Sequence, residues 1–284
     1  MRELTKKERE LIDNDLEFLE RFCSYFGFLN TEYFKDRYNA ISVCIGDFKK
    51  GSKLKGYVVY NPNTVELNEE IINDDYLRLR TLYHEVGHLL FNYPLMSQKE
   101  IRELRNKQMQ VAINVPSSSH YLEPNPNLAM AGYKMLHEYI CEKFSSIAAN
   151  SFFHQKPTRK YNQTGDICGE NYKFNTTFDG NYGLIESVCD EFFSKYYSSV
   201  LDILKECLNN SFYLQLYDKY NEIDVFRFLE NLGRLYNVFD SYHEGVTMFP
   251  KESSIKVMQI LNKLAHNAKL NDQVHIDREV ARVK

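Results

Sequence analysis

Residues 81–90 read Thr81-Leu82-Tyr83-His84-Glu85-Val86-Gly87-His88-Leu89-Leu90, an apolar run that contains the pattern HExxH. Asn73 or Asp74 can cap a helix before it. Apolar residues then recur at three- and four-residue steps, which predicts a buried helix that carries the motif; they are Tyr76, Leu79, Leu82, Tyr83, Val86, Leu89 and Leu90. Because residues four apart share a helix face, His84 and His88 can offer two imidazoles to one tetrahedral Zn²⁺.

Glu85 points about 100° away from His84 around the helix, where it can hold a water molecule against such a metal. The simpler alternative is a core helix on which two histidines happen to stack. The uncharged surroundings of the motif, with Val86 and Gly87 between the histidines, favour zinc.

A zinc site with an open position needs a third protein ligand. Phe91 and Pro94 stand where the metzincin pattern requires a glycine and a third histidine, so that class is excluded. Downstream, residues 135–145 read Met-Leu-His-Glu-Tyr-Ile-Cys-Glu-Lys-Phe-Ser, and their pattern predicts a helix with Glu138 and Glu142 on one face.

The combination of HExxH with a later Glu-x-x-x-Glu helix resembles the gluzincin-type zinc metallopeptidases, distantly the thermolysin-like and anthrax-lethal-factor-like catalytic domains. The resemblance covers about residues 40 to 145. It implies one Zn²⁺ per chain held by His84, His88 and Glu138, with Glu142 orienting a ligand imidazole and Glu85 as the general base. The helix also looks like the Glu-Gly-x-Thr-Glu-x-x-Ser segment of small bacterial relatives, from which Tyr139 and Cys141 depart.

Other residues compete for roles in this site. His120 and His137 are alternative third ligands, and Glu186 and Glu191 are weaker ones. A donor to the tetrahedral oxyanion is also needed, commonly a tyrosine or histidine. Tyr182 is the first choice, with His243 and Tyr133 behind it.

The chain of 284 residues carries a net charge of −4, which indicates neither a nucleic-acid nor an anionic-membrane partner. Its start lacks the apolar core of a signal peptide, and its six cysteines form no CxxC pair. We therefore expect a cytoplasmic protein with free thiols, although export as an effector without a signal sequence stays open. The expected partner is a protein or peptide substrate, and the sequence indicates no oligomeric state.

The expected fold class is α+β and mostly helical, with a small twisted N-terminal sheet packed on the HExxH helix and an all-helical C-terminal lobe, as in zincins. Residues 1–155 would form the catalytic lobe, and residues 156–284 the lobe that completes the cleft. The predicted helices are 5–26, capped by Thr5 with Glu8, then 30–38, 97–112, 135–145, 184–204, 223–239 and 253–270. A strand is predicted in 40–48 and a hairpin over 56–60 and 64–68, with Thr64 to Asn68 as the edge strand that pairs with substrate.

The favoured function is hydrolysis of peptide bonds by a zinc metalloendopeptidase. One alternative is a catalytically weak or inactive zincin-like module that binds and regulates a protein partner. A helical interaction protein without metal is the other.

Overall fold

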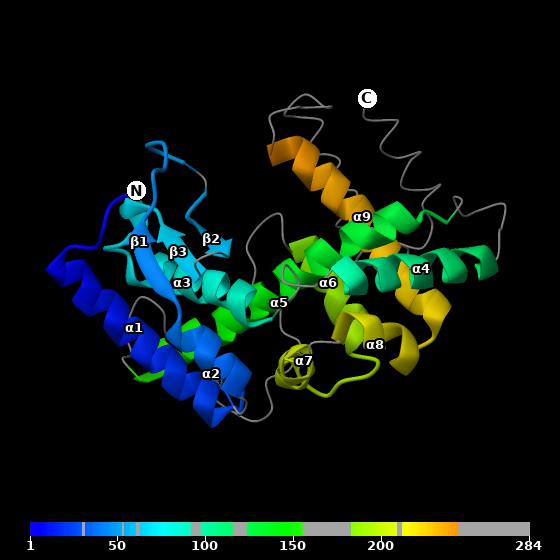
Figure 1. Ribbon diagram of the computed structural model, residues 1–284, viewed down its shortest axis with the longest axis horizontal. Helices are drawn as coiled ribbons and strands as arrows, with labels where there is room; N and C mark the ends of the chain where they lie inside the picture. Colours follow the sequence, from blue (N-terminus) through cyan, green and yellow to red (C-terminus); the bar gives the residue numbers. More distant parts are fainter. Residues whose placement is uncertain are drawn as a thin grey trace. The chain divides into compact units, whose positions relative to one another are not determined.

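The computed structural model describes residues 1–29, 32–52, 54–60, 63–91, 98–115, 124–155, 183–208 and 212–243. The fold is α+β and mostly helical, as predicted, with a small three-stranded sheet near the N-terminus (Figure 1). The helices run over α1 (Lys6–Tyr25), α2 (Glu32–Asn39), α3 (Asp75–Leu90), α4 (Gln98–Asn114), α5 (Pro126–Gln155), α6 (Gly183–Phe193), α7 (Val200–Cys207), α8 (Phe212–Lys219) and α9 (Glu222–His243). The strands are β1 (Ser42–Ile45), β2 (Gly56–Tyr60) and β3 (Asn63–Leu67), and a 3₁₀ turn, η1, covers Glu69–Ile71.

The chain forms two compact units that are interleaved along the sequence. Unit 1 comprises Met1–Pro94, Ile140–Lys173 and Ser198–Asn209, and unit 2 comprises Leu95–Tyr139, Phe174–Tyr197 and Asn210–Lys284. The 30-residue helix α5 contributes its first half to unit 2 and its second half to unit 1. The boundary after residue 155 that the sequence predicts stays a prediction. Since apolar residues lie on all sides of α5, either half can be buried against different neighbours.

The sheet of unit 1 has the order β1-β3-β2, with β1 parallel and β2 antiparallel to β3. The predicted hairpin is present. The predicted edge strand is wrong, because β3 lies in the centre, where it pairs with β1 on one side and β2 on the other. Val65 and Leu67 of β3 are fully buried, as a central strand that also packs against α3 requires.

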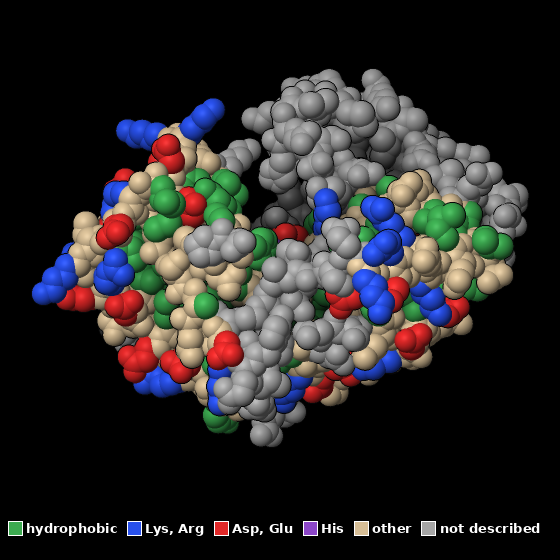
Figure 2. All heavy atoms as spheres, in the orientation of Figure 1, with side chains coloured by type: hydrophobic (Ala, Val, Ile, Leu, Met, Phe, Trp, Pro, Cys, Tyr) green, Lys and Arg blue, Asp and Glu red, His purple; other side chains and the backbone are tan. Residues whose placement is uncertain are grey.

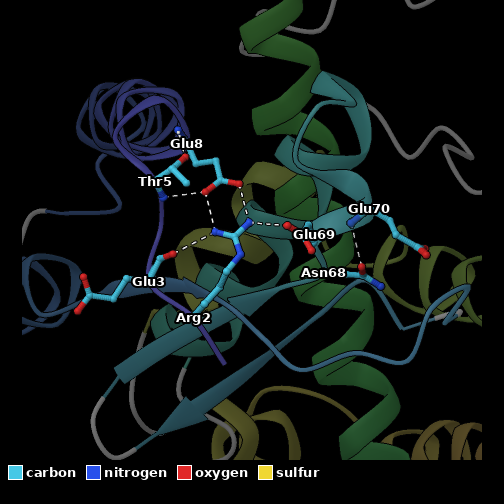
Figure 3. Close-up of polar contacts among 7 residues, drawn as sticks. All are labelled: Arg2, Glu3, Thr5, Glu8, Asn68, Glu69 and Glu70. Carbon is cyan, nitrogen blue, oxygen red and sulfur yellow. Dashed lines mark hydrogen bonds and ion pairs between the residues drawn. The ribbon is translucent and has the colours of Figure 1, made fainter.

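The N-terminal segment binds the outer edge of β1. Arg2 exchanges two backbone hydrogen bonds with Ile45, of 2.9 and 3.0 Å. Its guanidinium donates to both carboxylate oxygens of Glu8, at 2.9 and 2.8 Å, and to Glu69 at 2.7 Å (Figure 3). Glu8 also closes the predicted capping box with Thr5 at the start of α1. With β1 bridged in this way, β2 is the sheet's other edge.

A buried ion pair joins α1 to the HExxH helix within unit 1. Arg78 of α3 donates to Asp15 of α1 over 2.7 Å, and both side chains are 3% exposed. The Tyr83 hydroxyl donates to the backbone oxygen of Asp15 at 3.0 Å. These contacts set the position of α3, the helix that carries the motif, against α1.

Unit 2 is built where the first half of α5 crosses α9. A Cβ atom on Gly132 of α5 would lie 1.9 Å from the carbonyl oxygen of Leu229, and one on Gly233 of α9 would lie 1.8 Å from that of Leu128. Only glycine permits this backbone approach. Helices α4, α6 and α8 also contact α9.

The single helix predicted over 184–204 is wrong. Helix α6 ends at Phe193, and α7 begins after Ser199, whose hydroxyl accepts from the backbone N–H of Asp202 and caps it. The predicted helix 253–270 lies outside the described residues. Among the described helices, none combines the length and apolar character needed to cross a membrane. Acidic and basic side chains of the described residues are interspersed on the face shown in Figure 2.

Candidate metal centre

Helix α3 presents the two histidines of the motif toward one point. It starts after Asp74, one of the two predicted N-caps, whose carboxylate accepts from the backbone N–H of Leu77. The Nε2 atoms of His84 and His88 lie 3.0 Å apart, with the rings at 79°. Two nitrogens bound to one tetrahedral zinc lie about 3.4 Å apart, given bonds of 2.0–2.1 Å. A small widening of the pair would therefore admit the ion.

Glu142 of α5 lies behind His84. Its Oε2 is 2.9 Å from His84 Nδ1, and its other oxygen forms an ion pair with Arg80. Burial alone would raise the pKa of Glu142, but the His84 hydrogen bond and the Arg80 charge outweigh it and hold the pKa below its usual value. An ionised carboxylate beside Nδ1 favours a proton on that nitrogen, and Nε2 of His84 is then the nitrogen that would bind a metal.

Glu138 completes a set of three donors with the histidines. Donor atoms of His84, His88 and Glu138 all lie within 4.8 Å of one another. Glu138 and Glu142 lie one turn apart on the uninterrupted helix α5, so their carboxylates share one face of that helix. Glu138 joins the two imidazoles, and Glu142 contacts the far nitrogen of His84. Two imidazole nitrogens and one carboxylate oxygen are a donor set that suits zinc with an open position.

The close approach of α3 and α5 depends on Gly87. A Cβ atom at this position would lie 3.3 Å from Cα and Cβ of Cys141 and 3.3 Å from the Phe144 ring. The third residue after His84 is therefore small for a packing reason, and the small residue lets α5 bring its carboxylates to the histidines.

Glu85 lies beside the edge strand β2. It is 8% exposed. A Cβ atom on Gly56, the first residue of β2, would lie 2.6 Å from Thr81 Cγ2 and 3.3 Å from Glu85 Cγ. Glu85 belongs to neither donor set found among the described residues.

The competing ligand candidates have other surroundings. His137 is buried, its Nδ1 lies 3.0 Å from the Tyr213 hydroxyl, and it joins a different donor set with His88 and Cys141. Glu186 is buried on α6, and among the described residues no donor set contains it or Glu191. His120 lies outside the described residues.

The oxyanion donor stays a prediction. Tyr182, the first choice, lies outside the described residues. Tyr133 is buried in unit 2, where its hydroxyl donates to the backbone oxygen of Tyr213 at 3.1 Å. His243 is the last residue of α9, in unit 2.

Sequence reasoning missed two residues of this centre. Arg80 lies one turn before His84, and a cation on that face of a buried helix was a readable signal for an acidic partner. Cys141, read only as a departure from a family pattern, lies with Sγ 3.4 Å from Nδ1 of His88. A contact between α3 and α5 that joins residues 53 positions apart in the sequence leaves no local signal. No protein-family model, no curated protein and no solved structure matches the chain.

Proposed function

We propose that the protein is a zinc-dependent metalloendopeptidase. The observation that carries the proposal is the convergence of His84, His88 and Glu138, whose donor atoms lie within 4.8 Å of one another, with Glu142 behind His84. When bound, zinc would supply Lewis acidity that acts on a water molecule and on the substrate carbonyl. One Zn²⁺ per chain is the expected content.

The residues of the chain would divide the remaining work. Glu142 and Arg80 hold the ring of His84 in the orientation that directs Nε2 to the metal. Glu85 accepts the proton of the attacking water and delivers it to the leaving amine.

The substrate would lie as an extended peptide along β2. This strand is an edge of the sheet, and its first residue, Gly56, lies against Glu85. Backbone hydrogen bonds to such an edge recognise a peptide with little dependence on its sequence. The described cysteines are free thiols, a state that fits catalysis in the reducing cytoplasm.

Zinc binding is the first test. Wild-type protein should hold one zinc per chain, measured by elemental analysis after dialysis. Glu138→Ala should weaken zinc binding strongly, and His84→Ala with His88→Ala should abolish it, whereas the control Glu191→Ala, an exposed carboxylate on α6, should keep it. Retention of stoichiometric zinc in the double histidine variant would end the proposal.

The second test separates binding from chemistry. Glu85→Gln should keep zinc and fold while losing turnover by about 10²- to 10⁴-fold. Wild type and Glu85→Gln would be expressed side by side and new protein N-termini compared by mass spectrometry. If both proteins hold zinc and no terminus differs, the alternative applies, a zincin-like module that binds and regulates a protein partner.

A further inference from the structure

His88 has a different side chain at each ring nitrogen. Its Nε2 lies 3.0 Å from Nε2 of His84, and its Nδ1 lies 3.4 Å from Sγ of Cys141. Donor atoms of His88, His137 and Cys141 also lie within 4.8 Å of one another. One imidazole therefore belongs to two donor sets, one that contains a carboxylate and one that contains a thiol.

The geometry of the thiol set suits a metal ion. His137 and Cys141 are one turn apart on α5, so both point to the same side of that helix. The Tyr213 hydroxyl is 3.0 Å from Nδ1 of His137 and fixes the orientation of this ring. A nitrogen and a sulfur bound to one tetrahedral zinc lie about 3.6 Å apart, close to the 3.4 Å between His88 and Cys141.

The two donor sets favour different cations. The first set contains a carboxylate oxygen, whereas the second contains a sulfur, a soft ligand that favours soft cations. His137 and Cys141 are 2% and 0% exposed, so an ion held there would be shielded from water.

We propose that His88, His137 and Cys141 form a second cation site that favours thiophilic ions such as Cd²⁺ and, when occupied, excludes metal from the His84–His88–Glu138 site. Binding removes the thiol proton to solvent and forms the metal–thiolate bond. A neutral imidazole has one lone pair, so His88 binds through Nε2 with its proton on Nδ1, or through Nδ1 with its proton on Nε2. The ion-binding part stands independently, and only the consequence, inhibition by soft cations, rests on the proposed function.

The probe is Cd²⁺, titrated into metal-free full-length protein and followed by the ultraviolet absorption of cadmium–thiolate bonds. Wild type should gain this absorption at one equivalent. His84→Ala and Glu138→Ala, which change only the first set, should keep it, whereas Cys141→Ser should lose it. Cys189→Ser is the matched control, because Cys189 is a fully buried thiol of α6 in neither set.

His137→Gln should weaken cadmium binding at least 10-fold while the Cys141 thiol is intact, which separates loss of a ligand from loss of the thiol. Circular dichroism verifies the fold of each variant. Should Cys141→Ser unfold, Cys141→Ala and His137→Gln replace it. An absorption that survives in a folded Cys141 variant, or that never forms in wild type, overturns the second site.

Competition separates this proposal from the proposed function. Zinc prebound at one equivalent should slow the cadmium absorption in wild type but not in Glu138→Ala. If zinc binding depends on Glu138 but cadmium forms no thiolate bond, the peptidase proposal stands and the second site fails. If the cadmium absorption depends on Cys141 but zinc binding does not depend on Glu138, the second site stands and the peptidase proposal fails.

Discussion

The buried ion pair between Asp15 and Arg78 gives the sharpest test of how the motif helix is positioned. The guanidinium donates to Asp15 at 2.7 Å and also to the carbonyl of Ile72 at 2.7 Å and to Asp75 at 2.9 Å. Both members of the pair are 3% exposed, whereas the side chain of Asp75 is 62% exposed. Removing either partner leaves the other charge buried without its ion-pair partner.

We expect each single substitution to lower the free energy of unfolding by about 3–5 kcal/mol. Asp15→Ala should lie at the lower end, because Asp75 and the Ile72 carbonyl stay with the guanidinium. Arg78→Ala should lie at the upper end, because it leaves the Asp15 carboxylate in the core without its guanidinium. Asp15→Leu with Arg78→Met should lose less than either single variant, since apolar groups of similar volume need no partner.

The measurement is urea unfolding of metal-free protein followed by circular dichroism, because bound zinc would add stability of its own. A loss of 3–5 kcal/mol moves the midpoint down by about 1–2.5 M at a slope of about 2–3 kcal/mol/M. A loss below about 1 kcal/mol in both single variants would refute the buried pair. A double variant that loses the sum of the two singles would refute the compensation argument.

Three further predictions concern other contacts. Glu142→Ala should weaken zinc binding by about 10- to 100-fold in a chelator competition, since Nδ1 of the first histidine loses its carboxylate, and unchanged affinity would contradict this. Gly132→Ala should lower the free energy of unfolding by about 1–3 kcal/mol, because the new Cβ meets the Leu229 oxygen at 1.9 Å, although alanine favours a helix by about 1 kcal/mol. Thermal unfolding that shows no loss would mean that the helices separate freely. The hydrogen bond from Arg2 lowers the pKa of Glu8 from 4.5 to about 2. The stability that this ion pair adds to the folded state is therefore present above pH 4.5 and is lost as the pH falls toward 2. The stability difference between wild type and Glu8→Gln should shrink over that range, and a constant difference would contradict the ion pair.

Local signals in the sequence predicted much of the fold. The capping box of Thr5 and Glu8, the cap at Asp74 and the hairpin β2–β3 each depend on residues within a few positions of one another. The break before α7 was also local, because Ser199 with Asp202 is a helix start that could have been read.

The order of the strands could not be predicted in this way. β1 pairs in parallel with β3, between residues 22 positions apart, although β2 lies between these two strands in the sequence. A short alternating strand shows the same residue pattern in the centre of a sheet as at its edge. The two halves of α5 pose the same difficulty, because an all-round apolar helix does not reveal which neighbour covers each half.

The candidate third ligand shows where sequence reasoning on the site reached its limit. His137 and Glu138 are adjacent on one predicted helix, about 100° apart, and the pattern alone cannot say which faces the histidines of α3. The close packing of Gly87 on Cys141 and the bond from Glu142 to His84 fix the rotation of α5. With Glu142 on His84, the residue one turn earlier on that face is Glu138. His137 and Cys141 then share the neighbouring face, which meets Nδ1 of His88. The same rotation thus produces both donor sets, so a variant that turned α5 would disturb zinc and cadmium binding together.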